Sequence, residues 1–380
     1  MKVVHICLSC FYIDGASYQE NELVRQHVAD GHEVLVIAST ENFSRDGLLT
    51  YVEPSSYIGE DGAPVVRLPY RSFLPHKVMR KLRLHPGVYE RLAEFRPDAI
   101  LFHGACGYEI ITVARYAAAH PSVPFYVDSH EDWNNSARNF VSRELLHKLF
   151  YRYCLKRALP AVRKVLCIST ETIDFVETVY RVPRERVEFY PLGGKLVPSE
   201  AYAERRSRAR SQLGIVDGEI IFLQSGKMTP RKKLIESLRA FASSAPAEAR
   251  FLITGVLQNE IKDEAEALIA RDPRVSFLGW KSADDLTDLL CAADVYLQPG
   301  TQSVTMQHSL CCHCAVILDD VPAHKVYFRN NGWPVTSQDT LERAIAEVAT
   351  ADLETMQENS FKIATEMLDY AKLAQRVLHH

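Results

Sequence analysis

Apolar runs of strand length alternate with segments of helical spacing along most of the chain. At its start, the apolar run at 2–9 is followed by helical spacing at 18–30, which Gly31 ends, and by a second apolar run at 32–39. Strands that are apolar along their whole length are typical of parallel sheets, because helices cover both faces of such sheets. Further strands of this kind are predicted at 98–103, 124–128, 164–169, 187–191, 220–224, 250–254, 275–278, 294–297 and 315–318.

Helical segments occupy most of the intervals between these strands. Ser169 and Ser282 each precede such a segment, and we expect them to be N-cap residues that accept hydrogen bonds from the first turn. Residues 40–68 are rich in Gly, Ser and Asp and predict a loop or short hairpin, whereas the polar, Arg-rich residues 195–214 predict a linker. Helices are predicted at 108–119, 138–160, 234–243, 260–269, 282–290 and 306–312, with two more within 340–378.

Two α/β series separated by a polar segment predict two domains. A chain of 380 residues suits two hydrophobic cores rather than one. We predict doubly wound Rossmann-like domains at 1–195 and 196–360 that face a central cleft, and a C-terminal helix at 361–380 that crosses back to the first domain. Ligands of such folds bind on loops at the carboxyl ends of the strands, so the loops there are the candidate site.

The overall composition excludes several classes of partner and location. A formal net charge of −4 gives no global footprint for nucleic acid, and no run of 18 apolar residues predicts a membrane-spanning helix. The first ten residues resemble a buried strand more than a signal peptide. Nine cysteines, mostly inside apolar runs, are typical of reduced core thiols. We therefore expect a cytoplasmic protein that has no nucleic-acid partner.

One segment is locally basic. Residues 71–85 carry several Lys, Arg and His side chains with apolar side chains between them. This pattern fits the solvated face of a helix, and it also fits a segment that contacts an anionic membrane surface. The second interpretation would place the protein at the inner face of the membrane.

A second basic segment lies between a strand and a helix. Residues 225–233 contain Gly226, Lys227, Arg231 and Lys232. They form either an exposed basic turn or a binding site for a diphosphate, because cations beside a helix N-terminus can neutralise two phosphates without a metal. The segment lacks the GxxxxGK[ST] pattern, and no GxGxxG follows the first strand, so neither a Walker loop nor a dinucleotide redox site is predicted.

Polar residues also follow the strand at 124–128. The run 128–132 reads Asp-Ser-His-Glu-Asp, which fits either a capping loop or a substrate-binding loop. In the second case His130 would lie at the substrate, and Glu131 or Asp132 could act as a base toward an acceptor hydroxyl.

Two further groups of residues have both a structural and a functional interpretation. Tyr18, Glu20 and Asn21 lie at a helix start, where they could cap the helix or contact an acceptor. The run 311–314 reads Cys-Cys-His-Cys, but contiguous residues at a helix end project in different directions, so core packing is favoured over zinc binding. No metal site is predicted.

The order of short motifs resembles that of the retaining GT-B glycosyltransferases of family 4. In the first half the similar segments are Gly15, the run 31–34 and the run 128–130, so the resemblance covers most of the chain. In the second half they are Gly226-Lys227, Pro230-x-Lys232, Gly255, the run 277–280, the run 292–295 and the run 314–317.

This resemblance implies roles for particular residues. Lys227 and Lys232 would hold the diphosphate of a nucleotide-sugar donor and stabilise the leaving group. His130 would lie near the donor sugar, and Gly15 would belong to the loop that approaches the donor phosphates and the acceptor. No cofactor or metal is implied; the donor is a substrate.

The family's two glutamates, eight residues apart, are missing. One alignment puts Gly300 and His308 in their places, and a shift by one residue puts Pro299 and Gln307 there. Gln307 could serve the ribose hydroxyls as a neutral amide. Neutral groups are also available for the sugar and β-phosphate, from the side chain of Gln302 and the backbone amides of Ser303, Val304 and Thr305.

The sequence therefore predicts a metal-independent transferase that moves a sugar from a nucleoside diphosphate to an acceptor hydroxyl. By resemblance, the acceptor is a sugar or lipid-linked molecule in cell-surface polysaccharide or glycolipid assembly. The alternatives are a sugar-nucleotide epimerase or hydrolase of the same fold, and a binding module in which loss of both glutamates abolished catalysis.

Overall fold

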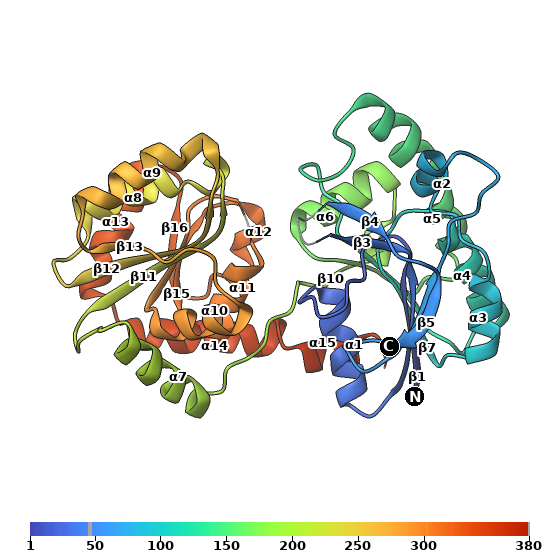
Figure 1. Ribbon diagram of the computed structural model, residues 1–380, viewed down its shortest axis with the longest axis horizontal. Helices are drawn as coiled ribbons and strands as arrows, with labels where there is room; N and C mark the ends of the chain where they lie inside the picture. Colours follow the sequence, from blue (N-terminus) through green and yellow to red (C-terminus); the bar gives the residue numbers. More distant parts are fainter. Residues whose placement is uncertain (45–47, 302, 379–380) are drawn as a thin grey trace. The chain divides into compact units, whose positions relative to one another are not determined.

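The computed structural model describes residues 1–44, 48–301 and 303–378. It divides into two compact units (Figure 1). Unit 1 comprises Met1–Pro191 together with the chain from Tyr370 onward, and unit 2 comprises Leu192–Asp369. The predicted α/β class with two doubly wound Rossmann-like domains is confirmed by the sheet topology of each unit.

Unit 1 contains an eight-stranded sheet in the order β10-β9-β8-β7-β1-β2-β6-β5. All neighbouring strands are parallel except β5, which pairs antiparallel with β6. Strands β3 (Glu41–Phe43) and β4 (Leu49–Tyr51) form a separate hairpin. The sheet strands are β1 (Lys2–Cys7), β2 (Glu33–Ser39), β5 (Ser55–Ile58), β6 (Pro64–Leu68), β7 (Ala99–Phe102), β8 (Phe125–Ser129), β9 (Val165–Cys167) and β10 (Val187–Phe189).

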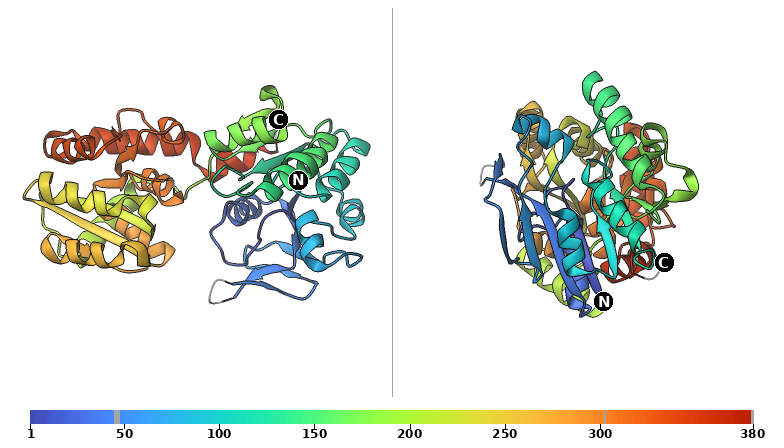
Figure 2. Two further views of the ribbon diagram at one scale, coloured as in Figure 1. Left: turned by 90° about the horizontal axis from the view of Figure 1, so that it is seen from above. Right: turned by 90° about the vertical axis from the view of Figure 1, so that its right-hand side faces the viewer.

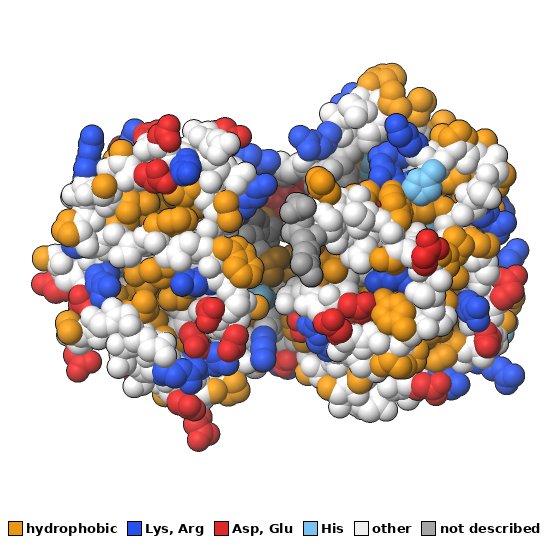
Figure 3. Space-filling model, viewed as in Figure 1, with side chains coloured by type: hydrophobic (Ala, Val, Ile, Leu, Met, Phe, Trp, Pro, Cys, Tyr) orange, Lys and Arg blue, Asp and Glu red, His pale blue; other side chains and the backbone are white. Residues whose placement is uncertain are grey.

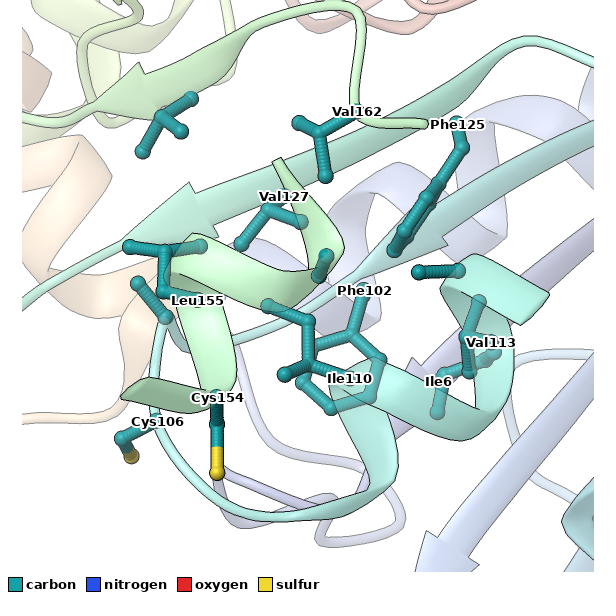
Figure 4. Close-up of a cluster of buried hydrophobic side chains, with 14 of the residues drawn as sticks. Ile6, Phe102, Cys106, Ile110, Val113, Phe125, Val127, Cys154, Leu155 and Val162 are labelled. Atoms are coloured by element: carbon teal, nitrogen blue, oxygen red, sulfur yellow. The ribbon is translucent and has the colours of Figure 1, made fainter. Parts of the chain in front are cut away.

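Alternate residues of these strands pack into the two layers of helices. In Figure 4, Ile6, Phe102 and Val127 of three strands lie against Ile110 and Leu155 of helices on one face. The intervening residues form a second cluster with α1 and α15 on the other face. The helical segments of unit 1 are α1 (Gln19–Ala29), α2 (His76–Leu82), α3 (Val88–Phe95), α4 (Glu109–Ala119), η1 (Val141–Tyr151), α5 (Arg152–Ala158), α6 (Thr170–Phe175), η2 (Val176–Tyr180), η3 (Arg184–Arg186) and α15 (Tyr370–Arg376).

Unit 2 contains a six-stranded, wholly parallel sheet in the order β13-β12-β11-β14-β15-β16. Helices cover both of its faces (Figures 1 and 2). Its strands are β11 (Ile220–Met228), β12 (Ala249–Leu257), β13 (Val275–Phe277), β14 (Val295–Gln298), β15 (Ala315–Asp319) and β16 (Gly332–Val335). Its helical segments are α7 (Ser199–Gln212), η4 (Pro230–Lys232), α8 (Leu234–Ser244), α9 (Asn259–Arg271), α10 (Ala283–Ala292), α11 (Val304–Cys311), α12 (Pro322–Lys325), α13 (Gln338–Glu347), η5 (Val348–Thr350) and α14 (Leu353–Met367).

The predicted linker at 195–214 is wrong, because most of it forms helix α7. Arg206 and Arg210 of this helix both contact the buried carboxylate of Asp294, which also accepts a hydrogen bond from the Ile221 amide at 2.7 Å. Charge neutralisation by a distant residue therefore allows an Arg-rich segment to pack as a helix.

The short hairpin that was one alternative for residues 40–68 is present as β3 and β4, but the end of this range and the C-terminal boundary differ from the prediction. Residues 64–68 form β6, a parallel strand of the main sheet, where Arg67 is buried among polar partners. At the other end, α14 packs on α11 and β15 of unit 2, so the chain enters unit 1 at Tyr370 rather than at 361.

Both serine N-caps are confirmed: Ser169 accepts from the Thr172 amide and Ser282 from the Asp285 amide. No helix within the described residues is long and apolar enough to cross a membrane.

Candidate functional site

In unit 2 the strand order reverses between β11 and β14, so the chain leaves these two neighbouring strands in opposite directions. At the strand ends themselves, the loop after β11 and the loop after β14 are still adjacent and are hydrogen-bonded to each other. The Thr301 amide donates to the Arg231 carbonyl at 3.0 Å, and Lys232 Nζ donates to the Thr301 carbonyl at 2.9 Å. A Cβ on Gly300 would lie 2.2 Å from the Arg231 carbonyl oxygen, so this close approach requires glycine.

Two buried side-chain amides donate hydrogen bonds to these loops. Gln224 of β11 donates to the Lys232 carbonyl at 2.9 Å, and Gln298 of β14 donates to the Thr301 carbonyl. Ser303 in turn donates to Gln298 Oε1 at 3.0 Å. Because buried amides are costly unless they are paired, these contacts fix the loops in one arrangement.

Lys232 is partly buried, which disfavours its charged form. Burial, with a smaller contribution from the charge of Arg231, lowers the pKa of its ammonium group to about 8. An approaching anion therefore stabilises the charged form of Lys232 more than it would stabilise that of an exposed lysine.

A cavity of about 470 Å³ opens beside these strand ends. It brings together the predicted residues Gly226, Lys227, Gly255 and Thr305. Gly226 and Gly255 are paired in the parallel register of β11 and β12, and a Cβ on Gly255 would lie 1.9 Å from the Gly226 carbonyl oxygen. With φ near +128° and +122°, the two glycines leave space that side chains would fill.

The predicted boundary between the strand at 220–224 and the basic segment at 225–233 is wrong. Strand β11 continues through Met228, so Gly226 and Lys227 belong to the strand, and Lys227 projects as an exposed side chain beside the cavity. The loop proper is the short η4 turn with exposed Arg231.

Several lining residues were not predicted as part of the site. Trp280 is 74% exposed, and Val256 and Leu286 add apolar surface beside it. Lys281 adds a further cation. The motif at 277–280 was the signal that could have identified the tryptophan, because a large exposed aromatic side chain after a strand needs an explanation.

The remaining predicted residues of this region follow β14. Ser303 precedes α11 as its N-cap residue, and Val304 and Thr305 form its first turn, where backbone N–H groups are free of intrahelical partners. Gln307 is fully buried and donates to the Tyr327 hydroxyl at 3.0 Å, so its side chain lies within the protein. Gln302 lies outside the described residues.

In unit 1 the loop after β1 contains Gly15. Buried Arg67 donates to the Tyr12 carbonyl at 2.9 Å, and buried Asp61 accepts from the Tyr12 hydroxyl at 2.6 Å. Gly15 has φ near +72°, where a side chain would be strained and would meet Glu60. Arg67 and Asp61, which sequence reasoning missed, therefore fix the loop that carries Gly15.

Asp128 and His130 meet at the carboxyl end of β8. Buried Asp128 accepts from the Gly104 amide at 2.8 Å, contacts His103 Nδ1 at 2.5 Å and lies 3.6 Å from His130 Nε2. Burial alone would lower the pKa of His130, but the charge and hydrogen bond of Asp128 outweigh burial and raise the pKa to about 9. His130, whose side chain is 31% exposed, can therefore present a positive charge at neutral pH.

The other polar residues of this loop have local partners. Glu131 turns inward and accepts from the Ser129 hydroxyl at 2.5 Å. Asp132 accepts hydrogen bonds from the backbone amides of Asn134 and Asn135 at 2.7 and 2.8 Å. Its carboxylate therefore caps the following turn. These contacts weaken the predicted role of either carboxylate as a base.

The predicted residues at the helix start, 18–21, differ in their exposure to solvent. Asn21 is fully buried, and its amide nitrogen donates to Asp61 at 2.6 Å and to the Ile13 carbonyl at 2.9 Å, so it supports the loop. Glu20 is buried, whereas Tyr18 is 46% exposed and remains accessible to an acceptor.

Among the described residues, no group of three or more His, Cys, Asp and Glu side chains could hold a metal ion. Cys311, Cys312 and Cys314 are buried, and His313 stacks on Tyr202 and Phe361. This agrees with the prediction that the Cys-Cys-His-Cys run packs in the core.

Comparisons with known proteins are consistent with this geometry. The family model described as Glycosyltransferase Family 4 matches residues 13–193, and that described as Glycosyl transferases group 1 matches residues 205–363. The chain is 24% identical over 324 residues to alpha-monoglucosyldiacylglycerol synthase of Streptococcus pneumoniae (strain ATCC BAA-255 / R6), an overlap of 80% of this chain and 71% of that protein.

Solved structures share the fold over nearly the full length. HepE of Anabaena in complex with UDP has a TM-score of 0.66 at 16% identity, covering 99% of this chain and 98% of that one. Sucrose-phosphate synthase from Thermosynechococcus elongatus has a TM-score of 0.63 at 15% identity, covering 99% and 96%. Together with the two family matches, these results show that the chain belongs to the GT-B glycosyltransferases, with a family 4 first half and a group 1 second half.

Proposed function

We propose that this glycosyltransferase uses a nucleoside diphosphate sugar whose nucleotide binds in the cavity of unit 2. The observation that carries the proposal is the arrangement around β11 and β12, where Lys227 lines a cavity left open by two paired glycines. Arg231 and Lys232 stand in the short turn that follows β11. Backbone that approaches a ligand closely beside cations is suited to phosphate recognition.

The base and the diphosphate would use different parts of this cavity. The exposed ring of Trp280 and the side chain of Val256 offer a face on which a nucleobase can stack. The diphosphate would lie toward Lys227 and the first turn of α11, whose amides begin at Val304. HepE, which shares the fold, is recorded in complex with UDP.

We propose that the reaction needs no metal, because Lys227, Arg231 and Lys232 can supply the positive charge that the leaving diphosphate requires. His130, kept protonated by Asp128, would donate a hydrogen bond to an oxygen of the donor. Turnover measured after exhaustive chelation tests the first point. Full activity in EDTA supports it, and activity restored only by Mg²⁺ or Mn²⁺ contradicts it.

The acceptor is proposed to be lipid-linked and presented at an anionic membrane. The related synthase is named for a diacylglycerol glycolipid. In η1 and α5, Val141, Leu145, Leu149 and Tyr153 recur every four residues, and all are at least 54% exposed. This spacing gathers them in one stripe; Figure 3 shows hydrophobic side chains at the tip of the segment that Figure 1 colours green.

The predicted basic segment contacts the same helical segment through a buried tyrosine. The Tyr151 hydroxyl donates to the Lys81 carbonyl at 2.5 Å, which joins η1 to α2. Phe73, which belongs to the basic segment 71–85, is 66% exposed. Apolar side chains flanked by Lys and Arg are typical of helices that lie in a membrane interface.

A sedimentation assay tests the membrane proposal. Vesicles with phosphatidylglycerol should bind the protein more strongly than neutral vesicles, and Leu145→Ser with Leu149→Ser should reduce that binding at least about fivefold. Val216→Ser, which changes a 64% exposed valine of unit 2, is the matched control. Equal binding of all three proteins would contradict the proposed surface.

The donor proposal is tested by thermal shift with UDP-, GDP-, ADP-, dTDP- and CMP-sugars, followed by turnover with the sugar that stabilises the protein. No nucleotide raising the midpoint would contradict the proposal. Residues 299–307 contain no carboxylate, which favours a binding module as the second candidate. Nucleotide binding without transfer or hydrolysis across an acceptor panel would support that candidate.

A further inference from the structure

Three buried histidines connect helix α15 to Asp128 of the candidate site. His27 Nε2 lies 3.1 Å from the Ala374 carbonyl, and His27 Nδ1 lies 2.9 Å from His5 Nε2. His5 Nδ1 lies 3.0 Å from His103 Nε2, and His103 Nδ1 lies 2.5 Å from Asp128. All three rings are inaccessible to solvent. We call His5, His27 and His103 the histidine array.

The two ends of the array are both acceptors, so one of its rings must donate from both nitrogens. The Ala374 carbonyl can only accept, so His27 Nε2 donates to it, and a neutral His27 accepts from His5 at Nδ1. A neutral His5 in turn accepts from His103 at Nδ1. A neutral imidazole carries one N–H and an imidazolium carries two. Four consecutive bonds thus need four protons, whereas three neutral rings supply only three.

The fourth proton is placed between His103 and Asp128 because His103 is the ring of the array that contacts the carboxylate, at 2.5 Å. Asp128 also accepts from the Gly104 amide and faces His130, and both contacts favour its carboxylate form. The extra proton therefore lies on His103, which donates from both nitrogens. At its other end the array stops at a carbonyl that cannot take up a proton, so the array does not conduct protons out of the site.

We propose that His103 is a positioning residue, which the histidine array and helix α15 hold as an imidazolium so that Asp128 stays a fixed carboxylate beneath His130. A buried carboxylate needs such a counter-charge to remain ionised. The role of His130 toward a donor rests on the proposed function, whereas the charge state of the array does not.

The electrostatic surroundings agree with this proton count. Burial and the adjacent rings keep the pKa of His5 well below its usual range, and burial lowers the pKa of His27 to about 4. For His103 burial is outweighed by the charge of Asp128, and the pKa rises to about 10. The other titratable groups that interact with the array are Cys7, Glu20, Asp30 and His32, and His130 faces Asp128.

Helix α15 contributes the acceptor that sets this direction. Without it, three bonds would remain, and three neutral rings would satisfy them. Seating of α15 on His27 is therefore coupled to the uptake of one proton at His103. In sequence α15 follows α14 after only two residues, Leu368 and Asp369, so the coupling depends on the segment that arrives from unit 2.

The test uses the full chain labelled with ¹⁵N-histidine, without substrate, so that its failure is distinct from failure of the proposed function. Long-range ¹H–¹⁵N spectra report the tautomer and charge of each ring, and His103→Gln assigns the key signals. We expect His103 to stay an imidazolium between about pH 6 and 9, while His5 and His27 stay neutral with the proton on Nε2. A neutral His103 or a charged His5 at pH 7 would overturn the proposal.

Paired variants separate the array from simple packing. His27→Gln keeps one donor and one acceptor and should preserve the His103 signal, whereas His27→Met removes both. In His27→Met, His103 should lose its proton at least about one pH unit lower than in the native chain. His120→Gln, on an exposed histidine, is the control. An unchanged His103 titration in His27→Met, or equal shifts in both His27 variants, would contradict the proposal.

Discussion

Lys232 makes the affinity for a nucleoside diphosphate depend on pH in a calculable way. Burial and Arg231 lower the pKa of its ammonium group to about 8 in the unliganded protein. A bound diphosphate would favour the charged form and return the pKa toward the ordinary value of about 10.4. The proton is thus needed for binding and is already present below pH 8.

The sign and the size follow from this difference. With a pKa of about 8, Lys232 of the unliganded protein is about 90% protonated at pH 7 and about 10% protonated at pH 9. Binding at pH 9 must include uptake of the missing proton. Affinity should therefore fall about tenfold between pH 7 and pH 9, or about 1.4 kcal/mol. The phosphate itself stays ionised in this range, since its last pKa is about 6.

Isothermal titration calorimetry with the nucleotide selected by thermal shift measures this fall. Lys232→Met should bind weakly at both pH values and lose the tenfold difference. Lys227→Met is the informative control, because it removes an exposed lysine that lines the same cavity but leaves Lys232 in place, so the tenfold difference should stay intact. A native affinity that is equal at pH 7 and pH 9, or a tenfold fall that persists in Lys232→Met, would refute the reasoning.

Three further predictions concern separate parts of the molecule. Trp280→Ala should weaken nucleotide binding by about 1–3 kcal/mol by calorimetry, the usual value of base–aromatic stacking, and unchanged affinity would remove the ring from the site. Asp128→Asn removes the anion beside His130, whose pKa of about 9 should fall to or below the ordinary value of about 6.5 in NMR titrations; a pKa that stays near 9 would contradict this. Asp294→Ala leaves Arg206 without its buried partner and should lower the free energy of unfolding in urea by about 2–4 kcal/mol, somewhat less than the about 3–5 kcal/mol of a fully buried pair because the guanidinium is partly exposed; a loss below about 0.5 kcal/mol would refute it.

The fold was predictable where hydrophobic periodicity is strong. Strands such as β1 and β2 are apolar along nearly their whole length, so a parallel sheet follows from local sequence. Strand β6 was not predictable in this way, because its five residues begin with Pro64 and include Arg67, whose partners lie in other segments. Helix α7 was missed for the same reason, since Asp294 is far away in sequence.

The site was predictable to the extent that it is made of contiguous motifs. The basic turn and the first turn of α11 could be placed by their order along the chain, as could His130 after β8. The histidine array could not, because its members come from three separate parts of the chain. The register of β1 with β7 brings His5 to His103, and the packing of α1 on β1 brings His27 to His5. Isolated histidines in apolar runs give no signal that they share a proton.

Helix α15 also has a consequence for the order of folding during synthesis. Unit 2 is made of one continuous stretch, Leu192–Asp369, whereas unit 1 uses the first 191 residues and the segment from Tyr370 onward. Until α15 emerges from the ribosome, His27 and Tyr190 lack their partners on Ala374 and Leu373, and part of the apolar face of the first sheet stays uncovered. The domain that is synthesised first is therefore completed last, and a nascent chain is open to aggregation through that face during the whole time in which unit 2 is translated.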